Sequence, residues 1–184
     1  MTLQEKGEKL VLKFNLPHGL ESIGEVHLVG NIALATTVKP DIDVQLYTNP
    51  TSWKLNSKII IDYFATFGLN SYITRDLKES HKYLVSFEYW VDEIRWTIDI
   101  TQTVPSKDYL KDAYRFYLDY QDQFTDQKTK TIRELKKHFL DLDMLHHSMS
   151  FYIYQAVLEK EAISPDDVLA FIKSNQINIK RFKK

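Results

Sequence analysis

The segment that most constrains the fold starts directly after Pro40 and alternates polar with apolar residues, as Asp41-Ile42-Asp43-Val44-Gln45-Leu46-Tyr47. Successive side chains of a β-strand point to opposite faces, so Asp41 and Asp43 would share one face, about 7 Å apart along the chain. Proline has no N–H to donate to a sheet, so the strand is expected to begin at Asp41. The pattern predicts a strand that buries one face and presents two carboxylates on the other.

A short apolar run, residues 26–29, precedes this strand and ends at Gly30. We predict a buried strand over 26–29 and two helical turns over 31–37, with Asn31 as the N-cap of that helix. A glycine directly before a helix start lets backbone N–H groups approach a phosphate closely. Gly30 is therefore a candidate for contact with a phosphate.

Residues 83–91 and 94–101 predict a β-hairpin that turns at Asp92-Glu93. In its second arm, Asp99 falls in mid-strand on the polar face, opposite an apolar face of isoleucines and Trp96. Nucleotidyl transfer uses divalent metals held by protein carboxylates. Asp99 is therefore the natural candidate to join Asp41 and Asp43 from a neighbouring strand.

Other segments of the first half predict two helices. A capping box formed by Thr2 and Glu5 would start the first of them. The second would follow the turn at Asn49-Pro50, and its spacing predicts a buried face made of Leu55, Ile59, Tyr63 and Phe67.

The chain beyond Pro105 predicts only helices, over 106–124, 126–145, 148–160 and from Ser164-Pro165 to about 174. The expected class is α+β. The expected organisation is an α/β core over residues 1–104, followed by a helical unit over 105–184 that packs on the core.

Composition excludes several classes of function. The chain has no cysteine, which rules out a disulfide scaffold, a thiolate zinc site and a cysteine nucleophile. The net charge of -1 supplies no field that would draw the protein onto nucleic acid, so a nucleic-acid partner is not favoured. No apolar stretch approaches the length of a membrane span, and we expect a cytoplasmic protein without a membrane partner.

Residues 26–44 resemble the signature of the nucleotidyltransferase superfamily, whose members share a DNA polymerase β-like fold. That signature is a strand, Gly-Ser or Gly-Gly, a short helix, and Asp-x-Asp on the next strand. The run Lys39-Pro40-Asp41-Ile42-Asp43 also resembles the GrpB-type branch. The resemblance implies a nucleotidyltransferase-like mixed sheet with flanking helices, followed by a C-terminal helical unit.

The same resemblance implies a metal-dependent nucleotidyltransferase that moves a nucleoside monophosphate from an NTP, expected to be ATP, to a small-molecule or protein acceptor. Asp41, Asp43 and Asp99 would hold Mg²⁺ or Mn²⁺, and Asp99 would also help to activate the acceptor hydroxyl. Gly30 and Asn31 would bind the nucleotide phosphates. Lys39 is a further candidate for phosphate contact because of its charge.

Position 31 departs from the family pattern, which has Ser or Gly where this chain has Asn31. The departure motivates an alternative function, in which the fold is kept as a catalytically inactive nucleotide-sensing or protein-interaction module. Other interpretations also remain open at this point. Asp41 and Asp43 could be solvated acids on an edge strand, and Asp99 could be an ordinary exposed position of a half-buried sheet.

A second Asp-x-Asp pair, Asp141 and Asp143, falls in a predicted helix, where its two carboxylates would point in different directions. Asp143 with His146 and His147 would be an alternative metal site. The tyrosines of 106–124 are expected to pack the helix rather than to stack on bases.

Overall fold

The computed structural model describes residues 1–146 and 148–182. It divides into two compact units, Met1–Asp119 and Tyr120–Lys184, so the segment 105–119 belongs to the first unit, whereas the sequence predicted a division after residue 104. The predicted α+β class with a mixed sheet and flanking helices is confirmed. The packing of the helical unit on the core stays a prediction.

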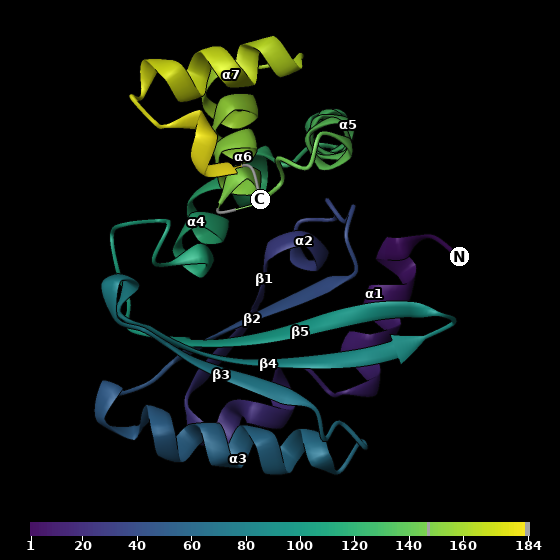
Figure 1. Cartoon of the computed structure of the whole chain (residues 1–184), viewed down its shortest axis with the longest axis vertical. Coiled ribbons are helices and arrows are strands. Elements are labelled where there is room, and N and C mark those ends of the chain that lie inside the picture. Colours follow the sequence, from purple (N-terminus) through teal and green to yellow (C-terminus); the bar gives the residue numbers. More distant parts are fainter. Residues whose placement is uncertain (147, 183–184) are drawn as a thin grey trace. The chain divides into compact units, whose positions relative to one another are not determined.

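The first unit is built on a five-stranded sheet with the order β1-β2-β5-β4-β3 (Figure 1). The strands are β1 (Glu25–Val29), β2 (Asp41–Tyr47), β3 (Tyr72–Leu77), β4 (Lys82–Val91) and β5 (Ile94–Thr103). β2 and β5 are parallel, and the other neighbouring pairs are antiparallel. The strand predicted to start at Asp41 and the hairpin predicted at Asp92-Glu93 are both confirmed.

Two helices, α1 (Leu3–Lys13) and α3 (Trp53–Ala65), cover one face of this sheet (Figure 1). The capping box predicted at Thr2 and Glu5 starts α1. Phe14, directly after α1, contacts the ring of Phe64 on α3 with the two ring centroids 5.7 Å apart. The core beneath them is the apolar face of the strands, including Ile42, Val44, Leu46, Val85, Phe87, Trp96, Ile98 and Ile100.

The buried face predicted for α3 is correct in part: Tyr63, and Phe67 just after the helix, are partly buried and pack against the core, but Leu55 and Ile59 do not. Leu55 and Ile59 are 62% and 41% exposed, and the residues that α3 buries are Asn56, Ser57, Ile60 and Phe64. The polar side chains tolerate burial because they are hydrogen-bonded. Ser57 Oγ donates to the carbonyl of Trp53 and accepts from Gln102 Nε2 of β5, a contact between distant segments that helical spacing does not reveal.

Three predicted helices are shorter than expected, and the one predicted over 126–145 is α5 (Asp126–Asp141). The helix predicted over 31–37 is α2 (Gly30–Ala33), which stops before Ala35, whose φ of 52° is left-handed. The helix predicted over 106–124 is α4 (Ala113–Tyr120), preceded by a loop and followed by a 3-10 turn. The 3-10 segments are His18–Ile23, Pro50–Ser52, Lys78–Ser80, Gln121–Gln123 and Ile179–Phe182.

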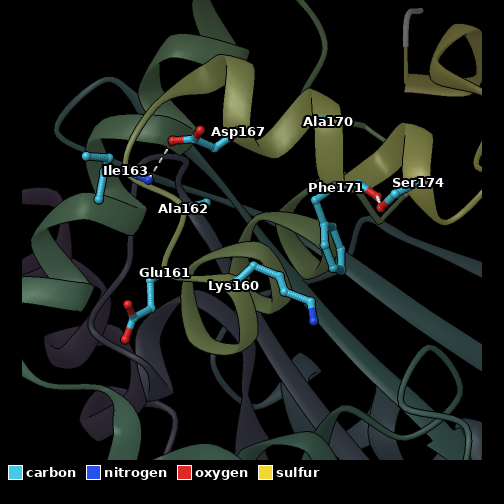
Figure 2. Close-up of a pocket in the computed structure, with 8 residues that line it drawn as sticks. All are labelled: Lys160, Glu161, Ala162, Ile163, Asp167, Ala170, Phe171 and Ser174. Atoms are coloured by element: carbon cyan, nitrogen blue, oxygen red, sulfur yellow. Dashed lines mark hydrogen bonds between the residues drawn. The ribbon is translucent and has the colours of Figure 1, made fainter.

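The second unit contains α5 (Asp126–Asp141), α6 (Met149–Lys160) and α7 (Pro165–Ser174). The start predicted for the last helix is confirmed, with Ser164 as N-cap, Pro165 at N1 and Asp167 closing a capping box. A pocket of about 560 Å³ lies in this unit where the end of α6 meets α7, and Figure 2 draws the residues that line it. It is lined by Lys160, Glu161, Ala162, Ile163, Asp167, Ala170, Phe171 and Ser174.

β3 is the last strand of the sheet, and all six of its residues are exposed. Its apolar side chains include Tyr72 and Ile73, which are 46% and 52% exposed. Within the described residues, no helix is both long enough and apolar enough to cross a membrane.

Replacing Gly7 with alanine should destabilise the protein, although this change usually stabilises a helix by about 1 kcal/mol. A Cβ at Gly7 would overlap the Cδ1 of Ile32 and lie 3.0 Å from the ring of Trp96. Overpacking of this kind costs about 1–3 kcal/mol, measurable as a lower free energy of unfolding in urea. Leu12→Ala, at a position of α1 that is 79% exposed, should change it little. Stabilisation by Gly7→Ala would contradict the packing of α1.

Candidate active site

The three predicted carboxylates lie on the polar face of two neighbouring strands. In the parallel β2–β5 pair, Asp43 is directly beside Asp99, and Asp41 is beside Thr97. Side chains at the same level of adjacent strands share a face, and residues two apart on one strand share it as well. β2 lies between β1 and β5, so the interpretation of Asp41 and Asp43 as acids of an edge strand was wrong.

Position 30 requires a glycine because the Asp43 side chain lies so close to its backbone. Its φ of +67° is left-handed, and a Cβ placed on it would overlap Oδ2 of Asp43 and lie 3.1 Å from the Cγ of that carboxylate. Only glycine combines this backbone conformation with so close an approach of a side chain. The glycine predicted from the signature thus makes room for the carboxylate at the beginning of α2.

Asp41 is contacted from two sides. Asn31 Nδ2 donates to Oδ1 of Asp41 at 2.5 Å, and Lys39 Nζ lies 3.6 Å from Oδ2. The N-cap of α2 is Val29, whose side chain makes no capping hydrogen bond. The prediction of Asn31 as an N-cap was therefore wrong, because its amide reaches across to β2 instead.

Asp99 is half-buried and accepts a hydrogen bond from Ser86 Oγ of β4 at 2.5 Å. Burial raises the pKa of Asp99 above its ordinary value, and the charge of Asp41 acts in the same direction. The Ser86 hydrogen bond and the positive charges of Arg75 and Lys39 offset this only in part. Asp99 is thus a carboxyl group with an increased affinity for a proton.

The donor chemistry of this face suits a hard divalent cation, since Asp43 and Asp99 offer carboxylate oxygens at one level of the sheet. Across residues 1–146 and 148–182, however, no group of three or more His, Asp or Glu side chains has a metal-holding arrangement. Asp41 is engaged with Asn31 and Lys39. Asp43 and Asp99 therefore fit a divalent cation as a pair of neighbouring carboxylates.

A buried carboxylate that the sequence did not suggest anchors the start of α4. Asp112, 1% exposed, accepts hydrogen bonds from Gln45 Nε2 at 2.8 Å and from the hydroxyl of Tyr47 at 2.6 Å. It also accepts from the backbone N–H groups of Ser106 and Arg115. An acid just before a helical run is a capping signal, but its partners on β2 could not be read from that signal.

These contacts set the charge of the Asp112 group. Burial alone would raise the pKa of Asp112, but the hydrogen bonds from Tyr47, Gln45 and the two N–H groups outweigh it and lower the pKa. Burial and the bond to Asp112 raise the pKa of Tyr47. Asp112 is therefore held as a carboxylate and Tyr47 as a neutral phenol.

A pocket of about 410 Å³ lies beside this anchor, lined by Glu25, Tyr47, Pro105, Ser106, Lys107, Asp112, Tyr114, Arg115 and Leu118. The ring of Tyr114 stacks on that of His27, with centroids 3.3 Å apart and planes inclined by 7°. At this position the aromatic residue of α4 packs on a sheet residue, in keeping with a packing role.

The role of Lys82, at the start of β4, was also not predicted from the sequence. Its Nζ donates to the carbonyl of Leu110 at 2.9 Å and so ties the loop before α4 to the sheet. Burial lowers the pKa of Lys82, and the charges of Asp112, Asp108 and Asp43 offset this in part. A lysine at an alternating strand position gives no sequence sign of such a contact.

The alternative site in the second unit is only partly described. His146 Nε2 lies 2.9 Å from Asp143 Oδ1, and His147 falls outside the described residues. The prediction that both acids of this pair lie in a helix was wrong for Asp143: Asp141 is the last residue of α5, and Asp143 follows the helix with a left-handed φ of 52°.

Opposite pKa shifts at Asp99 and Asp112 predict opposite effects of amide substitution on stability. A raised folded-state pKa means that stability is lost as pH rises from the unfolded value through the folded one, so Asp99→Asn should raise the melting temperature at pH 7. A lowered folded-state pKa means that the contribution of Asp112 is present at neutral pH and is lost as pH falls through the folded value. Asp112→Asn should therefore lower the melting temperature at pH 7.

Melting curves between pH 3 and pH 8 test both expectations. The difference between Asp99→Asn and the parent should shrink as the pH falls toward about 3.9, the ordinary pKa of an aspartate, because the raised folded-state pKa lies above that value. The difference between Asp112→Asn and the parent should shrink only as the pH falls below about 3.9, because the lowered folded-state pKa lies under it. Equal melting temperatures for the parent and Asp99→Asn across the whole range would show that Asp99 is not desolvated.

No protein-family profile matches the sequence, and no curated protein matches it. Solved structures do match. The poly(A) polymerase complex GLD-2–GLD-3 has a TM-score of 0.57 at 14% identity, covering 100% of this chain and 68% of that one. The Cid1 poly(U) polymerase bound to MgATP has a TM-score of 0.55 at 12% identity, covering 84% of this chain and 49% of that one.

A cytoplasmic RNA terminal U-transferase matches with a TM-score of 0.53 at 12% identity, over 84% of this chain and 47% of that one. The chain thus spans about half the length of the Cid1 and U-transferase chains. At these identities the likeness concerns the fold, and the GrpB-type branch stays a prediction. The chain has the nucleotidyltransferase fold predicted from the segment around Gly30, Asp41 and Asp43.

Proposed function

We propose that the chain is a metal-dependent nucleotidyltransferase that moves a nucleoside monophosphate from an NTP to an acceptor hydroxyl, with loss of pyrophosphate. The observation that carries this proposal is the parallel register of β2 and β5, which sets Asp43 directly beside Asp99 on the polar face of the sheet. Cid1 structures bound to MgATP and to MgGTP support an NTP and Mg²⁺ as the partners.

Asp43 and Asp99 would hold Mg²⁺ or Mn²⁺, with Asp41 as the third carboxylate. When bound, such a cation neutralises the charge of the triphosphate and of the oxygens that attack and leave. Asp99 would take up the proton of the acceptor hydroxyl, a role that suits a carboxylate whose pKa is raised by burial.

The nucleotide phosphates would lie at the start of α2, against the backbone N–H groups of Gly30 and Asn31 and the amine of Lys39. Lys39 is about one-third exposed and lies beside Asp41, so its charge is within reach of a phosphate bound by the carboxylates. The acceptor would be a small molecule or a protein, because the net charge of -1 gives no general attraction to nucleic acid. A cytoplasmic location is part of the same proposal.

One observation favours the alternative of a catalytically inactive nucleotide-sensing or protein-interaction module. The side chain of Asn31 stands where the family has Ser or Gly, and its amide is engaged with Asp41. This alternative predicts nucleotide or partner binding without release of pyrophosphate.

Replacing Asp43 with asparagine should reduce pyrophosphate release by on the order of 100-fold or more, because a charge that stabilises the transition state is lost. The assay uses ATP, UTP and GTP with Mg²⁺ or Mn²⁺ and a panel of small hydroxyl compounds, a hydroxyl-bearing peptide and a short RNA. Turnover on RNA alone would replace the proposed acceptor class.

The control is the double substitution Asp141→Asn with Asp143→Asn, which makes the same kind of change at both acids of the Asp-x-Asp pair of the second unit. It should leave turnover unchanged. Loss of turnover in this control together with full activity of Asp43→Asn would contradict the proposed site. Nucleotide binding by the parent without turnover under every condition would establish the inactive alternative.

A further inference from the structure

Asn31 is buried, whereas Lys39, Asp41, Asp43 and Asp99 of the site are only partly buried. It is 5% exposed, in the four-residue helix α2, and its Nδ2 lies 2.5 Å from Asp41 Oδ1 across the gap to β2. An amide nitrogen is only a donor and a carboxylate only an acceptor, so the pair is chemically matched. A hydrogen bond to a charged group is stronger than one between neutral groups.

The helix that carries Asn31 is itself held in place. Gln4 of α1 donates from Nε2 to the carbonyl of Ile32 at 3.0 Å and accepts from Thr37 Oγ1 at 2.5 Å. Gly7 of α1 packs directly against the side chain of Ile32. Because α2 is fixed from behind by α1, the Asn31 amide is a rigid donor rather than a mobile surface group.

The hydrogen bond from Asn31 also determines which lone pairs of the Asp41 carboxylate remain free to bind another group. A carboxylate has two oxygens and about four lone-pair directions. Asn31 occupies one direction on Oδ1, and Lys39 Nζ at 3.6 Å approaches Oδ2 only loosely. The side chain of Asp41 is thereby fixed in one rotamer, with acceptor capacity left on both oxygens.

We infer that Asn31 is a positioning residue that orients the Asp41 carboxylate, rather than a side chain that contacts the nucleotide. The part of this inference that concerns metal binding rests on the proposed function, in which Asp41 is a metal ligand. Carboxylate ligands of metals are themselves oriented by hydrogen bonds from neighbouring residues. The substitution of Asn for Ser or Gly at this position then exchanges a phosphate contact for control of a metal ligand. A serine would be too short to reach β2 from the same backbone position.

A double-mutant cycle between Asn31 and Asp41 tests the inference. Mn²⁺ binding to the nucleotide-free protein is measured by electron paramagnetic resonance for the parent, Asn31→Ala, Asp41→Ala and the double variant. Asn31→Ala should weaken binding by about 10–100-fold, the usual effect of removing a group that orients a ligand. In the Asp41→Ala background the same change should have no further effect.

Two other variants sharpen this measurement. Asn31→Ser should weaken Mn²⁺ binding as much as Asn31→Ala does, because the hydroxyl cannot replace the amide. Asn56→Ala removes an equally buried amide, 6% exposed, from α3 on the far side of the sheet, and should leave binding unchanged. Tighter binding in Asn31→Ala, or an equal loss with and without Asp41, would overturn the inference.

The same cycle measured by urea unfolding without metal separates this inference from the proposed function. If Asn31 orients Asp41, the losses of stability in the two single variants are not additive, and the double variant loses less than their sum. Additive losses would overturn the positioning role. A parent protein that binds no Mn²⁺ would remove the metal-dependent function, while the unfolding cycle alone would then decide the role of Asn31.

Discussion

The parallel pairing of β2 with β5 is the contact on which the candidate site depends, and it brings together residues 56 positions apart in the chain. Every other pair in the sheet is antiparallel and joins two strands that follow each other in the chain. Two parallel strands need a long crossover between them. Here the crossover contains α3 and the strands β3 and β4, so the core that α3 buries also fixes the level at which Asp43 meets Asp99.

Local features of the fold could be predicted because neighbouring residues determine them. The start of β2 after Pro40, the hairpin turn at Asp92-Glu93 and the capping boxes at Thr2 and Ser164 all follow from contacts within a few positions. The buried face of α3 could be predicted only in part in this way. Its orientation depends on hydrogen bonds of Ser57 with Gln102 and on ring contacts of Phe64, and these partners lie far away in sequence.

In the site, too, local sequence patterns predicted some features, and contacts between distant segments determined the others. The strand alternation placed Asp41, Asp43 and Asp99 on polar faces, and the parallel register brings those faces together. The partners that set the properties of these carboxylates come from elsewhere: Ser86 for Asp99, Gly30 for Asp43 and Asn31 for Asp41. Asn31 is of a residue type that often caps helices. Only the distance between its amide and the Asp41 carboxylate on β2 shows that it binds a carboxylate instead.

The free edge of the sheet at β3 has a consequence for the behaviour of the protein in concentrated solution. A terminal strand exposes unpaired backbone groups that can recruit a strand from another molecule. Tyr72 and Ile73 would favour such recruitment, while Arg75 and Asp76 set two charges in the middle of the six-residue strand. Buried charge without a partner is costly, so Arg75 and Asp76 would oppose the pairing of another chain at this edge, which is the edge of the sheet farthest from β1.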